Sequence, residues 1–176
     1  MERYSEVLGL PVICAENGKR LGTVKDVIFC LGLKEVKAFL LEHEGWHLYK
    51  RVILLRDVLD VGRDAVIVND RKCVTGMRKA EKDGELQYKG ELKDLRVYSK
   101  SGEDLGIVKD ILFDHKTGLI EGLEISDGLL QDLIQGRKVL PLYGKVEFSS
   151  DNVLVGRESV EEIIETGRGL KKLLNR

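Results

Sequence analysis

The sequence has few cysteines, few aromatic residues and almost no net charge. Only three cysteines occur in 176 residues, Cys14, Cys30 and Cys73, and they lie far apart with no Cys-x-x-Cys motif. This pattern argues against a disulfide framework or a thiolate zinc site and favours ordinary buried thiols. The formal net charge of −1 also argues against a general electrostatic attraction to nucleic acid or anionic lipid.

Long apolar runs are missing as well. No segment approaches the roughly 18 apolar residues of a membrane-spanning helix, and no basic-then-apolar leader opens the chain. With 34% charged and 43% hydrophobic residues, the composition is typical of a soluble globular protein. We therefore predict a cytoplasmic protein that does not span a membrane.

What the sequence does contain is an internal repeat. The stretch Gly18–Phe29, GKRLGTVKDVIF, recurs as Gly102–Phe113, GEDLGIVKDILF, at a constant shift of 84 residues. Each copy consists of short β-branched and apolar runs separated by turn residues, which is typical of all-β domains. The alternation of apolar residues slips at Lys25–Asp26 and again at Lys109–Asp110, and this predicts a β-bulge in each copy.

The two copies follow the same plan of strands. A third strand at 35–42 matches 119–126, a fourth at 51–55 matches 138–142, and a closing strand at 64–68 matches 151–155. This plan predicts a first barrel at 1–76, a linker at 77–91, a second barrel at 92–157 and a C-terminal helix at 158–176. The helix is expected because Ser159-Val160-Glu161-Glu162 is a capping box.

The order of the repeated motifs resembles the PRC-barrel family. These motifs are Leu-Gly-x-Val-Lys-Asp, then Val36-x-Ala38 or Ile120-x-Gly122, then Arg137–Leu142. That family shares a domain with the H subunit of the photosynthetic reaction centre and with the C-terminal barrel of a ribosome-maturation factor. The resemblance covers both halves and is close to the tandem PRC-barrel proteins of spore-forming bacteria. It implies an all-β fold of two tandem small PRC-type β-barrels, finished here by the short C-terminal helix.

Because family members are mostly interaction modules, the resemblance implies binding without catalytic residues or cofactors. We expect a non-enzymatic adaptor that binds an unidentified protein partner through the loops between the third and fourth strands. The predicted partner-binding residues are the large apolar and aromatic residues of these loops: Trp46, Leu48, Tyr49, Leu129, Leu130, Leu133 and Ile134. Such residues either plug the open ends of the barrels or form a patch that a partner covers. A homo-oligomer is also possible.

Two other functions remain open. An RNA-processing or ribosome-assembly accessory is the main alternative. The basic cluster from Arg71 to Lys82 and the cations at the C-terminal end would then contact phosphate, weakly and with strong salt dependence. A zinc hydrolase is suggested only by His43–His47, which matches His-Glu-x-x-His. That motif needs a helix, whereas here it ends a strand and contains Gly45. We therefore predict no metal site, and we expect Asp26 and Asp110 either to accept backbone hydrogen bonds at the bulge or to pair locally.

Overall fold

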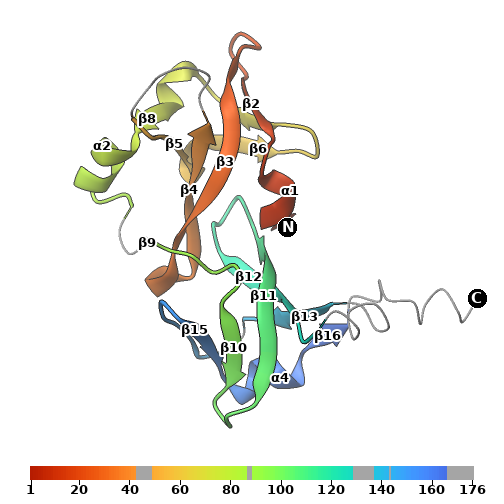
Figure 1. Ribbon diagram of the computed structural model, residues 1–176. Coiled ribbons are helices and arrows are strands. Elements are labelled where there is room, and N and C mark those ends of the chain that lie inside the picture. Colours follow the sequence, from red (N-terminus) through yellow and green to blue (C-terminus); the bar gives the residue numbers. More distant parts are fainter. Residues whose placement is uncertain (43–48, 87–88, 129–136, 143, 166–176) are drawn as a thin grey trace, which may run out of the picture. The chain divides into compact units, whose positions relative to one another are not determined.

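The computed structural model describes residues 1–176 except 43–48, 87–88, 129–136, 143 and 166–176. The chain divides into two compact units (Figure 1). Unit 1 contains Met1–Gly90 together with Phe113–Ile120, and unit 2 contains Glu91–Leu112 together with Glu121–Arg176. Residues 113–120 fall within the range predicted for the second barrel, but they belong to unit 1.

Unit 1 is built on one sheet with the strand order β6-β7-β2-β3-β4-β5-β8, and β9 pairs with β3; the short strand β1 is not part of this sheet, which β2 opens. Its strands are β1 (Glu2–Arg3), β2 (Pro11–Cys14), β3 (Arg20–Cys30), β4 (Glu35–Glu42), β5 (Arg51–Leu54), β6 (Val58–Val61), β7 (Val66–Val68), β8 (Val74–Gly76) and β9 (Lys89–Gly90). Its helices are α1 (Tyr4–Val7) and α2 (Met77–Lys82), with 3₁₀ turns η1 (Leu31–Leu33), η2 (Leu55–Asp57) and η3 (Arg71–Cys73).

Unit 2 repeats this order strand for strand, as β14-β15-β10-β11-β12-β13-β16. Its elements are β10 (Arg96–Ser99), β11 (Asp104–Phe113), β12 (Ile120–Ser126), β13 (Lys138–Pro141), β14 (Val146–Phe148), β15 (Asn152–Val155), α4 (Arg157–Glu161) and β16 (Ile164–Glu165). In both units the opening strand pairs in parallel with a later strand, β2 with β7 and β10 with β15. The all-β fold and the duplication predicted from the sequence are confirmed.

Bulges bend the long strands of the sheets. The predicted bulge in the first copy is confirmed, because Val24 and Asp26 pair with consecutive residues of β4 and Lys25 has no partner there. A second bulge, which the sequence did not predict, lies at Leu21 between β2 and β3. It recurs at Leu105 between β10 and β11. An extra residue at these places increases the local twist and lets a strand curve around a small core.

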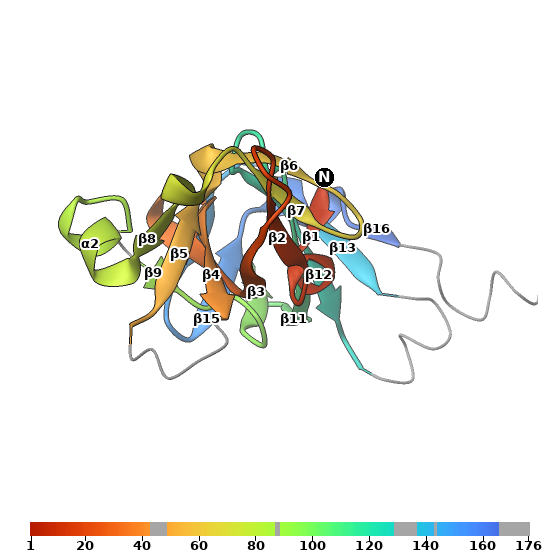
Figure 2. The ribbon, with the colours of Figure 1, turned by 90° about the horizontal axis from the view of Figure 1, so that it is seen from above.

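The range predicted as a linker, 77–91, contributes to the core of unit 1. Ala80 on α2 and Leu86 are only 2% and 4% exposed, and they pack in one cluster with Ile28, Ala38 and Val52. Figure 2 shows α2 beside β8 at one edge of the unit, and the two elements are in contact. This stretch is charged overall because only a few of its side chains face inward.

The C-terminal helix is shorter than predicted. α4 ends at Glu161, and Ile164–Glu165 then forms β16, which pairs antiparallel with β13. The predicted helical positions Ile163 and Ile164 therefore lie outside the helix. The chain leaves the helix because Glu162 takes up a non-helical φ of −101° and ψ of 14°. The remainder of the predicted helix, 166–176, lies outside the described residues.

Candidate binding surface

Tyr49 is the only predicted partner-binding residue that the structure describes. It stands just before β5 and is 67% exposed, and the guanidinium carbon of Arg78 lies 5.9 Å from the centre of its ring. This geometry is that of a cation–π contact. The other predicted residues, Trp46, Leu48, Leu129, Leu130, Leu133 and Ile134, lie outside the described residues, as does the His43–His47 motif.

Two hollows on unit 1 adjoin Tyr49, and both are lined by Tyr49 and Gly76. The first has a volume of about 550 Å³, and its charged lining residues are Lys50, Arg78, Lys79 and Glu81. The second has a volume of about 590 Å³, and its charged lining residues are Lys19, Arg20, Arg51 and Arg71. We call the lining of both hollows together the Tyr49 surface.

Strand pairing brings the parts of the Tyr49 surface together. β5 pairs antiparallel with β8, so that Arg51 at the start of β5 is opposite Gly76 at the end of β8. The chain then turns directly into α2, and the backbone N–H of Met77 donates to the carbonyl of Lys50 at 2.9 Å. Residues 49–51 and 76–79 are consequently neighbours, although about 25 residues separate them in the sequence.

The Tyr49 surface is strongly cationic in a chain whose formal net charge is only −1. Seven lysine and arginine side chains line the two hollows, against the single carboxylate of Glu81. Among the described residues, none of the seven forms an ion pair with a carboxylate. A concentration of unneutralised charge of this kind raises the local potential and attracts anionic groups.

Arg51 is the most perturbed member of this group. Its Nε atom is buried and makes no hydrogen bond to any described residue. Burial lowers the pKa of Arg51, and the positive charge of Arg71 lowers it further. Two guanidinium groups that repel each other in a partly desolvated hollow are stabilised when an anion lies between them.

The second repeat lacks part of this charge. Lys19 and Arg20 of the first copy correspond to Glu103 and Asp104 of the second, at the same shift of 84. The hollow of about 300 Å³ beside Glu103 is also lined by Arg157 and Glu161, and Arg157 is already paired with Glu161 at 2.7 Å. Comparing the charges of the two copies could therefore have revealed the basic turn at Lys19–Arg20 from the sequence.

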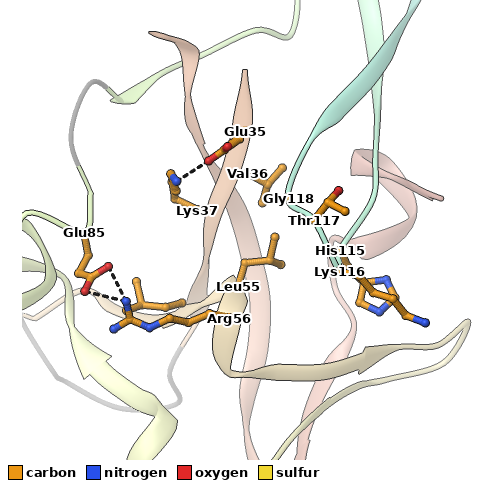
Figure 3. Close-up of a pocket in the computed structure, with 11 residues that line it drawn as sticks. Glu35, Val36, Lys37, Leu55, Arg56, Glu85, His115, Lys116, Thr117 and Gly118 are labelled. Atoms are coloured by element: carbon orange, nitrogen blue, oxygen red, sulfur yellow. Dashed lines mark hydrogen bonds and ion pairs between the residues drawn. The ribbon is translucent and has the colours of Figure 1, made fainter. Parts of the chain in front are cut away.

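A smaller hollow of about 200 Å³ lies elsewhere in unit 1, between the start of β4, η2 and residues 115–118 (Figure 3). Its charged groups are mostly paired within the protein. Arg56 donates to both carboxylate oxygens of Glu85 at 2.7 Å, and Lys37 pairs with Glu35 (Figure 3). Because these charges neutralise each other, this hollow offers less to a charged ligand than the Tyr49 surface does.

His115 lies beside that hollow and is held by Glu2. The carboxylate of Glu2 accepts the backbone N–H of His115 at 2.9 Å, and its other oxygen is 2.8 Å from Nδ1 of the ring. Nε2 lies 3.4 Å from Oδ1 of Asp60, in a geometry that is not a hydrogen bond. The contact fastens the start of the chain to a turn 113 residues later.

Glu2, Asp114 and His115 offer ligand atoms within 4.8 Å of one another, as a metal site requires. Both oxygens of Glu2 are already used by His115, and Oδ1 of Asp114 accepts the backbone N–H of Lys116 at 2.7 Å. That backbone hydrogen bond is the main reason why the pKa of Asp114 lies below its usual value. The three residues thus form a structural cluster that stabilises the turn.

Asp26 and Asp110 occupy equivalent places in the two units. Oδ1 of Asp26 accepts the backbone N–H of Val27 at 2.8 Å, and Oδ1 of Asp110 accepts that of Ile111 at 2.9 Å. Tyr4 also donates its hydroxyl to Asp26 at 2.9 Å. The prediction that both carboxylates accept backbone hydrogen bonds is confirmed.

The helices that the structure describes are all too short or too polar to cross a membrane.

Comparison with known proteins agrees with the duplicated fold. The family model for the PRC-barrel domain matches twice, at residues 1–73 and 85–158. The chain is also 26% identical over 162 residues to the uncharacterized protein YrrD of Bacillus subtilis, an alignment that covers 85% of this chain and 84% of YrrD. With two matches that together span most of its length, the chain belongs to the PRC-barrel family as a tandem protein of two such domains.

Proposed function

We propose that this protein is a non-enzymatic adaptor that binds a protein partner in the cytoplasm, and that the Tyr49 surface of the first PRC-barrel domain is its binding site. The observation that carries the proposal is the exposed ring of Tyr49, which lies between two hollows and has the guanidinium carbon of Arg78 5.9 Å from its centre. Tyrosine and arginine, together with tryptophan, are enriched at the energetic centres of protein interfaces.

The polar side chains of the described residues support binding rather than catalysis. The described histidine, His115, contacts the carboxylates of Glu2 and Asp60, and among the described residues it has no serine or cysteine partner. Asp26 and Asp110 each accept a backbone hydrogen bond. Nucleophilic catalysis by a serine or cysteine requires an activating base within hydrogen-bond reach of the nucleophile.

Site-specific photocrosslinking in native cells tests this proposal. A photoreactive phenylalanine analogue replaces Tyr49 in one variant and Leu59 in a matched control. Leu59 is 54% exposed on β6 of the same unit and lines neither hollow. We expect a discrete protein adduct from position 49 and none from position 59. Equal yields from the two positions, or no adduct from position 49, would contradict the proposal.

A second function, an RNA-processing or ribosome-assembly accessory, is favoured by the seven cations of the Tyr49 surface. Contacts made by lysine and arginine to phosphates release counterions, so binding of this kind weakens steeply as salt rises. We expect an RNA oligonucleotide to bind weakly and to dissociate above physiological salt. Tight binding that persists at high salt would place this function above the adaptor.

A further inference from the structure

The second hollow of the Tyr49 surface contains a pair of arginines with no anionic partner among the described residues. Arg51 lies at the start of β5, and Arg71 begins η3, which directly precedes β8. The two side chains line the same hollow and are close enough for the charge of Arg71 to act on Arg51. Lys19 and Arg20, from the turn before β3, line it as well.

Like charges are normally kept apart in a folded protein, or an acidic side chain is placed between them. Here the lining residues of the hollow include four cations and no carboxylate. The Nε donor of Arg51 is buried and has no acceptor among the described residues. A buried donor without an acceptor and a repulsive pair both destabilise the fold, and an oxyanion in the hollow relieves both.

We propose that this hollow binds a phosphate group, with Arg51 and Arg71 as the two principal contacts and Lys19 and Arg20 at its rim. The inference rests on the proposed function, because it assigns a ligand chemistry to part of the same surface. Nothing in it requires the ligand to be a protein or a nucleic acid. The phosphate group is the common element, and a free phosphate compound or a phosphate-bearing polymer could supply it.

A phosphate fits this lining better than a carboxylate. One guanidinium group pairs with a carboxylate through two parallel hydrogen bonds and thereby neutralises it. Two guanidinium groups together with two further cations match an anion that carries about two negative charges and offers more than two acceptor oxygens, as phosphate does near neutral pH. Arginine is also better suited than lysine to bidentate recognition of phosphate.

Two other charged hollows lack this combination. In the hollow of Figure 3, Arg56 is held by both carboxylate oxygens of Glu85. In the hollow of unit 2, Arg157 is held by Glu161. In the hollow beside Arg51, by contrast, no ion pair among the described residues has to be broken before an anion binds, and no carboxylate lines it, whereas Glu81 lines the first hollow of the Tyr49 surface.

Calorimetric titration of the full-length protein with inorganic pyrophosphate tests the proposal, with acetate at matched ionic strength as the competing anion. We expect pyrophosphate to bind and acetate to have no measurable effect. Arg71→Met and Arg51→Met should each weaken pyrophosphate binding about tenfold, since each removes one charge-assisted pair. Because Arg71 is exposed, Arg71→Met should fold and can be measured even if Arg51→Met does not fold.

Arg63→Met is the matched control. It removes one positive charge from the same unit at a side chain that is 91% exposed and lines neither hollow. We expect it to bind pyrophosphate as the wild type does. Equal weakening by Arg63→Met and Arg71→Met would mean a general charge effect and would overturn the site. Equal responses to pyrophosphate and acetate would also overturn it.

Two additional arms separate the source of the phosphate from the proposed function. A ten-residue oligouridylate is compared with pyrophosphate. Tighter binding of the oligouridylate, with the larger loss of affinity in Arg71→Met, identifies a polymer as the source of the phosphate. The same result for pyrophosphate identifies a small compound. The crosslinking variant at position 49 is then combined with Arg71→Met. Retention of the protein adduct, together with the absence of any phosphate binding, would reject the phosphate site and leave the adaptor function standing.

Discussion

Replacing Gly106 by alanine should disrupt unit 2 far more than the equivalent change at Gly22 disrupts unit 1. The two glycines are related by the shift of 84, and each follows the unpredicted bulge near the start of its long strand. Gly106 has a φ of +115°, a conformation that residues with a Cβ rarely adopt, whereas Gly22 has an ordinary negative φ. Their surroundings also differ.

The distances give the size of the effect. A Cβ on Gly106 would lie 2.2 Å from the carbonyl oxygen of Ser126, which is backbone of the neighbouring strand and cannot rotate away. A Cβ on Gly22 would lie 3.1 Å from the carbonyl oxygen of Glu42, which requires a shift of only a few tenths of an ångström. Backbone strain of about 1–2 kcal/mol, together with an overpacking cost of about 1–3 kcal/mol, gives roughly 2–5 kcal/mol for Gly106→Ala.

The substitution at Gly22 should change stability by no more than about 1 kcal/mol, because the entropy lost by the unfolded chain offsets the tight contact. Thermal unfolding followed by circular dichroism measures both variants. We expect Gly106→Ala to lower the unfolding midpoint of unit 2 by roughly 10 °C or more. Amide hydrogen exchange assigns the loss to β11 and β12. A midpoint for Gly106→Ala equal to or above that of Gly22→Ala would refute the reasoning.

Three further substitutions test other parts of the structure. Leu86→Ala, in the range predicted as a linker, should destabilise unit 1 by about 2–4 kcal/mol in urea unfolding, because the side chain is only 4% exposed and packs in the core. An unchanged midpoint would mean that Leu86 belongs to a linker and not to the core. Glu2→Ala should lower the free energy of unfolding by about 1–3 kcal/mol in the same assay, since it leaves the buried N–H groups of His115 without their acceptor. Glu2→Gln, which keeps one acceptor oxygen, should lower it less. The pKa of Asp114 lies below its usual value of 3.8, so its charge stabilises the fold above that pH and loses this effect as the pH falls through the lowered pKa. Wild type and Asp114→Asn should therefore differ in stability at neutral pH, and the difference should shrink as the pH falls below 3.8; a difference that stays constant as the pH falls would contradict this account.

The strand plan was readable from the sequence because it occurs twice. The predicted strand at Glu35–Glu42 has the bounds of β4, and the slip in apolar alternation at Lys25–Asp26 correctly predicts the bulge there. The short strands β6 and β14 were missed. Val58–Val61 and Val146–Phe148 have too few residues for a period of two to be recognised. α2 was missed because a helix of six residues that buries only Ala80 has the composition of a charged linker.

The candidate site was only partly predictable. Tyr49 was identified from the density of aromatic and apolar residues in its loop. Arg51 and Arg71 lie close together because β5 pairs antiparallel with β8, and no local sequence pattern encodes this pairing of strands. Contact of Glu2 with His115 spans 113 residues and was equally out of reach. The basic turn at Lys19–Arg20 was within reach, since its counterpart in the second copy is Glu103–Asp104.

The central claim is that the two PRC-barrel domains have diverged and that the first one carries the binding surface. The most direct measurement places the same photoreactive residue at Lys19 and at Glu103, which are repeat-equivalent, exposed positions in matching turns. Lys19 lines the Tyr49 surface, whereas Glu103 lines a different hollow in unit 2, beside Arg157 and Glu161 of α4. The account predicts an adduct from position 19, with the same partner that position 49 captures, and none from position 103. An equal or greater yield of that adduct from position 103 would contradict it.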